Sequence, residues 1–229
     1  GFIGSNLVRF MLEQNPDDSV LVADKLTYAG SLVNLADILE HPRFRFVRQD
    51  VCDPAVIDVV RGCDVVVHCA AESHVDRSIE DSSAFVHTNF QGTWQMLEAA
   101  RQAHVARFVQ ISPDEVYGSL AGEEKSVESS HLAPSNPYAA SKAAADLLVL
   151  SYVRTYRFPA VITRCSNNYG PHQFPEKFIP LMITQALADK PLPIYGDGQN
   201  IRDWIYVWDH CRAIDTILRS GREGETYNI

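Results

Sequence analysis

The chain lacks both an excess of basic residues and any long apolar run. Its 20 Lys and Arg face 29 Asp and Glu, which gives a net charge of -9, whereas a nucleic-acid surface normally needs a basic stripe. No segment reaches the roughly 20 apolar residues of a membrane span. We therefore expect no nucleic-acid partner and no membrane partner. Repeats and low-complexity tracts are also missing from the sequence.

Cysteine is scarce. The 5 cysteines are odd in number and lack metal-site spacing, which indicates reduced thiols and a cytoplasmic location. His74, His87 and His172 do not have the spacing of zinc ligands either, so we predict no metal. The chain opens on "GFIGSN" and stops at "GETYNI" inside an apolar stretch, and we expect it to be part of a longer protein.

Short apolar segments alternate with amphipathic ones. Strands are expected at 20–24, 44–47, 64–71, 107–112 and 160–165, and helices near 5–14, 31–40, 54–61, 84–104 and 137–156. Near-continuous apolar strands are buried on both faces, so the predicted fold is α/β, a doubly wound parallel sheet of the Rossmann type.

The regular alternation stops after Cys165. We therefore expect a cofactor-binding domain over 1–165, whose first strand lies upstream of Gly1. A smaller, incomplete substrate-binding region is expected over 166–229, with a helix at 207–219 that packs back on the first domain.

The opening glycines have the spacing of the last two glycines in a dinucleotide-binding turn, where the backbone approaches a pyrophosphate closely. A tight turn alone explains them equally well. Asp24, at the end of the next expected strand, favours the dinucleotide, because a carboxylate there binds the ribose hydroxyls of NAD and repels the 2′-phosphate of NADP. Lys25 beside it makes that choice less sharp. The turn residues are Gly1, Phe2, Ile3 and Gly4.

Further cofactor candidates follow the third and fourth expected strands. Ordinary loop packing explains each residue alone, but ligands bind in the crevice at the carboxyl ends of parallel strands. The candidates are Asp50, Val51, Ala70, Ala71 and Ser73.

Tyr138 and Lys142 lie one helical turn apart and so share a helix face. A surface pair is the alternative, because such matches arise by chance. A cation near a phenol, together with the positive ring of NAD, lowers the phenol pKa from about 10. The phenolate could then take a proton from a sugar hydroxyl.

With these motifs the chain resembles the dTDP-glucose 4,6-dehydratases of the extended short-chain dehydrogenase/reductase superfamily. The glycine turn and the Tyr–Lys pair occur in many sugar-nucleotide epimerases and decarboxylases, whereas "DEVYG", "ESHVDRS" and "NNYGP…FPEK" are narrower. The resemblance covers essentially all 229 residues through "GFIGSN", "DKLTYAG", "AAESHVDRS", "DEVYG", "YAASK", "CSNNYGPHQFPEKFIPLMI" and "PLPIYGDGQNIRDWIYV".

The resemblance implies a three-step reaction that uses NAD. Tyr138, assisted by Lys142, would deprotonate the hydroxyl on carbon 4 of glucose while NAD takes the hydride. Glu115 would remove the proton on carbon 5, and a protonated Asp114 would donate to the hydroxyl leaving carbon 6. Hydride would then return to carbon 6. Two adjacent acids suit this elimination because one must be charged while the other is neutral.

The resemblance also implies further binding residues and a homodimer that pairs the helices at 84–104 and 137–156. The additional cofactor candidates are Thr27, Gly30, Thr88 and Ser112, and the substrate candidates are Asn167, Lys177, Pro193, Tyr195 and Arg202.

Pro113 departs from the family, which has a threonine directly before the two acids. Proline has neither a hydroxyl nor a backbone N–H, and Ser112 points to the opposite strand face. We expect slower oxidation at carbon 4 in consequence. A UDP-sugar epimerase or decarboxylase is the alternative enzyme, and a catalytically impaired NAD-binding homologue is the alternative from another class.

Overall fold

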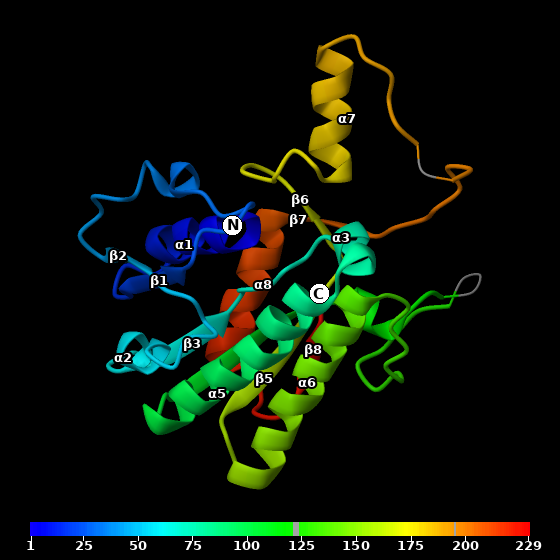
Figure 1. Cartoon of the computed structure of the whole chain (residues 1–229). Coiled ribbons are helices and arrows are strands. Elements are labelled where there is room, and N and C mark those ends of the chain that lie inside the picture. Colours follow the sequence, from blue (N-terminus) through cyan, green and yellow to red (C-terminus); the bar gives the residue numbers. More distant parts are fainter. Residues whose placement is uncertain (121–123, 195) are drawn as a thin grey trace.

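The computed structural model describes residues 1–120, 124–194 and 196–229, and the chain forms an α/β structure (Figure 1). The helices are α1 (Phe2–Gln14), η1 (Leu32–Leu35), α2 (Val56–Val60), α3 (Val75–Glu80), α4 (Ser83–Phe85), η2 (Val86–Gln91), α5 (Gly92–Gln102), η3 (Asp114–Tyr117), α6 (Pro137–Tyr156), α7 (Phe178–Leu187) and α8 (Val207–Ser220). The strands are β1 (Val20–Asp24), β2 (Phe44–Arg48), β3 (Val65–His68), β4 (Arg107–Pro113), β5 (Ala160–Cys165), β6 (Asn167–Tyr169), β7 (Trp204–Tyr206) and β8 (Thr226–Asn228).

Every strand pairing is parallel, as the apolar strands predicted. β1 pairs with β2, the strands β3-β4-β5-β8 form a second sheet in that order, and β6 pairs with β7. Within the described part of the chain, β1 and β3 are not hydrogen-bonded to each other. In Rossmann sheets the first strand lies between these two positions.

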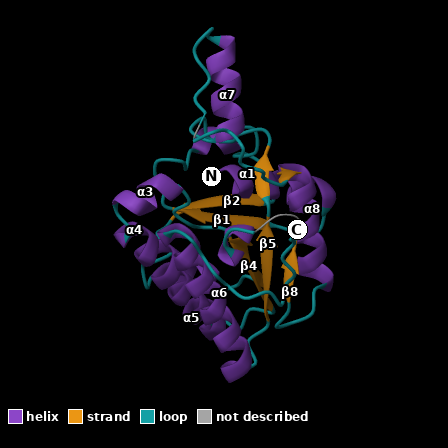
Figure 2. Ribbon diagram, turned by 90° about the vertical axis from the view of Figure 1, so that its right-hand side faces the viewer, coloured by secondary structure: helices purple, strands orange, loops and turns teal. Residues whose placement is uncertain are grey.

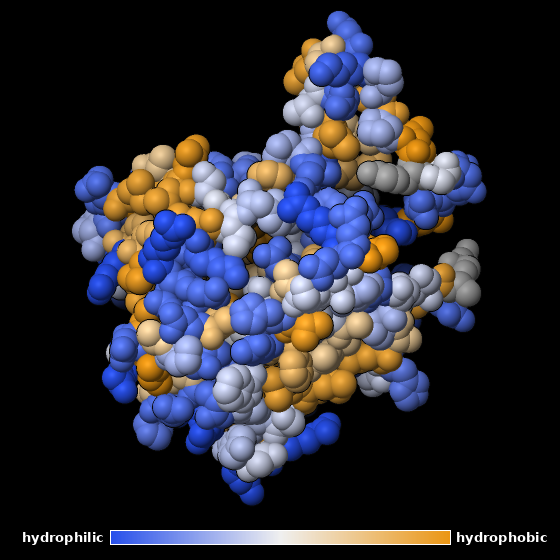
Figure 3. Space-filling model, viewed as in Figure 1, coloured by the Kyte–Doolittle hydropathy of each residue, from blue (hydrophilic) through white to orange (hydrophobic). Residues whose placement is uncertain are grey.

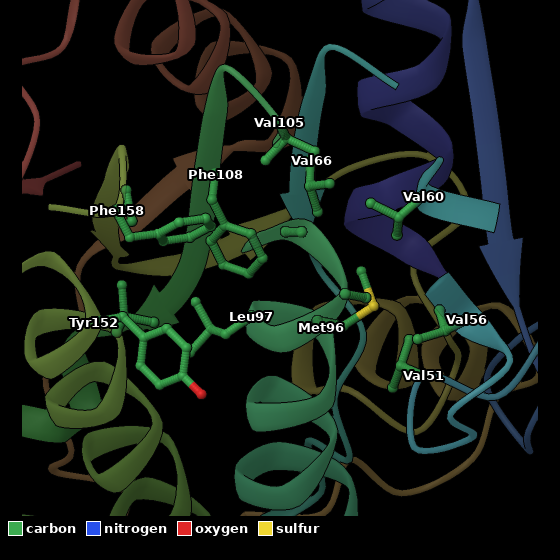
Figure 4. Close-up of a cluster of buried hydrophobic side chains, with 14 of the residues drawn as sticks. Val51, Val56, Val60, Val66, Met96, Leu97, Val105, Phe108, Tyr152 and Phe158 are labelled. Carbon is green, nitrogen blue, oxygen red and sulfur yellow. The ribbon is translucent and has the colours of Figure 1, made fainter. Parts of the chain in front are cut away.

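Helices cover both faces of the sheet, which confirms the doubly wound prediction. On β4, Phe108 packs with Leu97 of α5 and residues of α6 (Figure 4). Val109 instead packs with residues of α1 and α8. Both side chains are fully buried. Successive strand residues point to opposite faces, so a strand between two helical layers buries side chains on both faces, and on β4 this includes the polar Gln110. Burying one such side chain contributes about 1.5–3 kcal/mol.

β1, β5 and α6 occupy the residues that the sequence predicted. The predicted helix at 31–40 is wrong: the segment forms only the 3₁₀ turn η1, followed by turns. Arg9 of α1 explains the difference, because its guanidinium binds the Asn34 carbonyl at 2.6 Å and the Asp37 carboxylate at 2.9 Å. The strand predicted at 64–71 is also too long, since β3 ends at His68. Helices α3 and α7 were not predicted.

The helix predicted at 84–104 runs continuously from Ser83 to Gln102 but contains a π-helical turn, η2. Asn89 within this turn is fully buried. Its Oδ1 accepts the Glu72 N–H at 2.8 Å, and its Nδ2 donates to the Glu72 carbonyl and to Ser141 Oγ, each at 2.9 Å. The π turn therefore fastens the loop after β3 to α6.

The residues after Cys165 contribute β6, β7, β8, α7 and α8. α8 packs against α1 and β5 on one face of the sheet, whereas α7 stands away from the body (Figure 2) and has no buried residue. Asn6 of α1 donates to the Pro171 carbonyl at 2.9 Å and links the two parts. No described helix is both long and apolar enough to cross a membrane.

Candidate active site

A cavity of about 1490 Å³ opens at the carboxyl ends of β1, β3, β4 and β5, beside the start of α1. This is the edge at which open parallel sheets bind ligands. Of the predicted residues, Asp50, Pro193 and Arg202 lie outside its lining, and Tyr195 falls outside the described residues. The predicted residues in the lining are Gly1, Phe2, Ile3, Gly4, Asp24, Lys25, Thr27, Gly30, Val51, Ala70, Ala71, Ser73, Thr88, Ser112, Asp114, Glu115, Tyr138, Lys142, Asn167 and Lys177.

The glycine turn and Asp24 form one end of the cavity. A Cβ added at Gly4 would meet no protein atom within 4 Å, so this glycine keeps cavity volume open. Asp24 Oδ1 accepts the Leu26 N–H at 2.7 Å, and a Cβ at Gly30 would lie 3.2 Å from the same oxygen. Lys25 Nζ lies 3.2 Å from Asp50 Oδ2. The Lys25 ammonium, which could have bound the 2′-phosphate of NADP, is therefore already paired with a carboxylate. These residues fit an NAD molecule.

Tyr138 and Lys142 lie in the first turns of α6. Asn136 caps this helix by accepting the Ala139 N–H at 2.8 Å, and Pro137 suits the first helical position. The Tyr138 N–H donates to Ser78 Oγ at 3.2 Å, and Lys142 Nζ donates to the Ile111 carbonyl at 2.7 Å. The start of α6 is thereby fixed against α3 and β4.

Burial dominates the charge state of this pair. It raises the pKa of the Tyr138 phenol well above 10, with Glu115 adding to the effect, and it lowers the pKa of the Lys142 ammonium. In the protein alone burial therefore outweighs the neighbouring cation, and the lowered phenol pKa stays a prediction for the NAD-bound protein. The second contribution that we expect from the sequence is the positive charge of the nicotinamide ring, which would lower the phenol pKa when NAD is bound.

The acids Asp114 and Glu115 begin the short turn η3, directly after β4. Burial raises the pKa of Asp114, and the charge of Asp203 raises it further. Burial and the charge of Asp114 raise the pKa of Glu115, while Lys177 and Arg202 oppose that rise. Two carboxyls in one dry site tend to divide into one neutral and one charged group.

Three substrate candidates have defined partners in the structure. Lys177 Nζ donates to the Ser73 carbonyl at 3.0 Å. The Asn167 N–H donates to the Asp203 carbonyl at 3.2 Å. Arg202 is exposed, and its Nη1 donates to the Ile201 carbonyl at 2.7 Å. Its charge nevertheless reaches both acids, because it lowers their pKa values.

Ser112 and Pro113 differ in what they offer to the cavity. Ser112 is 1% exposed, and its Oγ is buried. Ser112 lines the cavity, but its hydroxyl leaves almost no exposed surface for a ligand in place of the missing threonine. Pro113 lines the cavity directly.

A cluster of Tyr28, Arg77 and Glu176 joins three segments at the cavity, and the sequence argument did not find it. The Arg77 guanidinium lies 3.9 Å from the centre of the Tyr28 ring and 3.5 Å from Glu176 Oε2. Burial and the charge of Glu176 raise the pKa of Tyr28 to about 12. Each residue comes from a different narrow motif, "DKLTYAG", "AAESHVDRS" or "FPEK", so their joint presence was the available signal.

The described residues contain no group of three His, Cys, Asp or Glu side chains that could hold a metal ion. All five cysteines are free.

A parallel Rossmann-type sheet with a glycine turn, an acid at the end of the following strand and a Tyr–Lys pair defines a nicotinamide-dependent enzyme of the short-chain dehydrogenase/reductase class. The model of the NAD dependent epimerase/dehydratase family matches residues 1–229. The chain belongs to this family.

Relatives within this family show to which enzymes the chain is similar. A dTDP-glucose 4,6-dehydratase of Neisseria gonorrhoeae is 53% identical over 242 residues, which cover 100% of this chain and 70% of the relative. The low-salt glycan biosynthesis protein Agl12 of Haloferax volcanii is 55% identical over 230 residues, covering 100% and 74%. These matches confirm the predicted resemblance to dTDP-glucose 4,6-dehydratases.

Solved structures agree. The dTDP-glucose 4,6-dehydratase DesIV of Streptomyces venezuelae, determined with NAD bound, superposes with a TM-score of 0.97 at 51% identity, covering 100% of this chain and 72% of that one. A UDP-glucuronic acid 4-epimerase of Bacillus cereus gives a TM-score of 0.94 at 32% identity, covering 100% and 74%. The fold is thus shared with epimerases, while the higher identity is to the dehydratase.

Proposed function

We propose that the protein is an NAD-dependent sugar-nucleotide 4,6-dehydratase that converts dTDP-glucose to its 4-keto-6-deoxy derivative. The observation that carries the proposal is the adjacent pair Asp114 and Glu115, which lines the same cavity as Tyr138 and Lys142. An epimerase eliminates no water and has no use for such a pair. The names of the relatives at about 50% identity support the same reaction.

The turn Gly1–Gly4, Asp24 and Gly30 would hold NAD, together with the small side chains Ala70 and Ala71 after β3. When bound, NAD supplies the hydride acceptor for carbon 4 and the hydride donor for carbon 6. Because Lys25 is paired with Asp50, Asp24 alone sets the preference at the ribose, and it favours NAD over NADP.

The protein's own groups would carry the proton transfers. Tyr138 takes the proton of the hydroxyl on carbon 4, and Lys142 orients it and supplies positive charge. Glu115 removes the proton on carbon 5, which the adjacent ketone has made acidic. Asp114 donates its proton to the hydroxyl on carbon 6, and that group leaves as water.

The surroundings of the two acids support this division of roles. Lys177 stabilises the charged form of Glu115, while Asp203 disfavours the charged form of Asp114. Arg202 favours the charged form of both acids, so it does not distinguish them. Burial raises the pKa of both acids, and the charges of Lys177 and Asp203 act on them in opposite senses, in the direction that suits Glu115 as base and Asp114 as acid.

Substrate binding involves the second part of the chain. We infer that Asn167, Lys177 and Arg202 bind the diphosphate, since a guanidinium can hold phosphate oxygens in bidentate fashion. Pro193 and Tyr195 would flank the base. Residues 1–165 would then serve as the cofactor domain and 166–229 as the substrate region. The free thiols fit a reducing compartment such as the cytoplasm.

A homodimer through α5 and α6 is the second part of the proposal. Hydrophobic side chains gather on the face of these helices (Figure 3), where Trp94 is 44% and Leu147 57% exposed. Exposed apolar patches of this kind mark interaction sites.

The complete protein incubated with NAD and dTDP-glucose tests the reaction. We expect a product lighter than the substrate by one water, identified by mass spectrometry. An unchanged mass with altered sugar stereochemistry would instead identify an epimerase. Tight NAD binding without any change in dTDP-glucose, UDP-glucose or UDP-glucuronate would indicate the catalytically impaired homologue.

A further inference from the structure

Two buried charges behind the active site take no part in the reaction described above. Tyr138, Lys142 and Asp146 follow one another at intervals of four along α6, so they share one face of the helix. Asp146 is fully buried, and its Oδ2 accepts from Arg164 Nε of β5 at 2.9 Å. Arg164 is only 3% exposed. A buried ion pair is costly to desolvate and seldom improves stability over apolar packing, so its position beside Lys142 points to another role.

Arg164 connects this pair to the turn that carries the two acids. Its Nη1 lies 2.9 Å from the hydroxyl of Tyr117, the last residue of η3, and its guanidinium lies 4.9 Å from the centre of that ring. The Tyr117 hydroxyl donates to Asn228 Oδ1 of β8 at 2.7 Å. A continuous polar chain therefore runs from α6, through β5, to the turn that begins with Asp114 and Glu115.

We propose that Asp146 is a positioning residue: it supplies the counter-charge that keeps the buried Lys142 ammonium protonated, and through Arg164 it fixes α6 against η3. The catalytic part of this inference rests on the proposed function. In this arrangement the base of the first step and the acids of the second step are held by one ion pair.

The charges around Lys142 support the first half of the proposal. Burial lowers the Lys142 pKa, and the charge of Asp146 is the largest influence that raises it. Burial raises the pKa of Asp146, and the charges of Arg164 and Lys142 oppose that rise by favouring its ionised form. His68 stays neutral at physiological pH because burial lowers its pKa to about 3. The titratable and charged groups that face Lys142 or its partners are Tyr138 and Asp146 on α6, His68 on β3, Cys69 directly after β3, Arg164 and Cys165 on β5, and Asp114 and Glu115 on η3.

The direct test measures the protonation of Lys142 in the complete, NAD-free protein. Trace acetylation with acetic anhydride across a pH series, read for Lys142 by peptide mass spectrometry, gives the pH at which the amine becomes reactive. We expect Asp146→Asn to lower this midpoint by about 1 pH unit or more. Asp146→Glu should restore it. Glu98→Gln is the matched control, because Glu98 also contacts α6, through the Tyr152 hydroxyl, but far from Lys142.

Steady-state kinetics provide the second readout. Asp146→Asn should lower kcat about ten- to a hundredfold, less than loss of the base itself, whose contribution is about 10²–10⁴. KM for the sugar nucleotide should stay unchanged, which separates a role through Lys142 from a role in substrate binding. Glu98→Gln should leave both kcat and KM unchanged.

The double variant Asp146→Asn/Arg164→Met covers a failure of the single variant to fold, because it leaves no unpaired buried guanidinium. An unchanged Lys142 midpoint in a folded variant, checked by circular dichroism, would overturn the proposal. A wild-type protein that does not dehydrate the sugar would overturn the proposed function instead, and the labelling result would still decide the role of Asp146 toward Lys142.

Discussion

Lys177 and Asp203 act in opposite senses on two neighbouring carboxyls. The charge of Lys177 lowers the pKa of Glu115, while that of Asp203 raises the pKa of Asp114. Both acids keep pKa values above those of exposed carboxyls because both are buried. At the residue scale, the site thus consists of identical functional groups whose roles are separated by their neighbours.

Replacing Glu115 by glutamine removes the proposed base of the elimination while keeping its size. We expect kcat to fall about 10²–10⁴-fold, whereas the first oxidation should survive and appear as absorbance of reduced nicotinamide in single-turnover mixtures. Glu80→Gln, an exposed change on α3, is the control. A Glu115→Gln variant with undiminished turnover would contradict the assigned role.

The pH dependence of kcat should follow the same two groups. Glu115 must be ionised, so activity should rise with pH through a pKa that burial has moved above the ordinary value of about 4.3. Asp114 must be protonated, so activity should fall as pH passes through its own raised pKa. The result should be a bell-shaped profile whose two limits belong to the coupled pair. An acid limb at the pH of an exposed carboxyl would refute it.

Pro113→Thr restores a hydroxyl beside the reacting oxygen. Since the Ser112 hydroxyl is buried, we expect kcat to rise about two- to tenfold, the value of one hydrogen bond. Pro113→Val has nearly the same shape without the hydroxyl and should give no such gain. Equal rates for the two variants would mean that the hydroxyl is not what the proline lacks.

At the element scale, the positions of the strands could be predicted because burial on both faces leaves a near-continuous apolar run. The long helices could be predicted because their buried side leaves apolar residues at regular intervals. α6 was found at its predicted residues for this reason. The turn at 31–40 could not be predicted, since it depends on Arg9, which is distant in sequence. α7 was missed because it has no buried face, so its pattern lacks the usual signal.

Some residues of the candidate site could likewise be predicted from the sequence, and others could not. Sequence could place the glycine turn, Asp24, the two acids and the Tyr–Lys pair, because each follows a strand or begins a helix. It could not find the Tyr28–Arg77–Glu176 cluster or the Asp146–Arg164 pair, because these contacts join segments that only the fold brings together.

The Tyr28–Arg77–Glu176 cluster should help to retain the cofactor, because it ties the loop after Asp24 to the segment before α7. We expect Arg77→Gln to weaken NAD binding about fivefold, the value of one cation–π contact, as measured by calorimetry on the complete protein. Arg212→Gln, which removes only a surface pair with Asp209, should have no effect. Unchanged NAD affinity in Arg77→Gln would remove this role from the cluster.

At the scale of the whole molecule, the cavity lies at one end of the sheet and the apolar face of α5 and α6 lies along its side. We expect Leu147→Glu to convert the complete protein from a dimer to a monomer, because it places a charge in the proposed contact. Light scattering measures the mass. Val33→Glu, at an apolar position that is 78% exposed, should leave the mass unchanged, and a monomeric wild-type protein would exclude the dimer.

The π turn η2 lies between the cavity and the apolar face of α5 and α6. It sets the angle about the helix axis by which one region is rotated relative to the other. Thr88 within the turn lines the cavity, and Trp94 just beyond it belongs to the exposed apolar face. One residue corresponds to about 100° of helix rotation. Deleting a single residue from 86–91 would therefore turn the proposed dimer surface away from its partner while the ligand-binding end stayed in place. Insertions and deletions in this helix should damage the proposed dimer contact far more than substitutions do, because they rotate the whole surface.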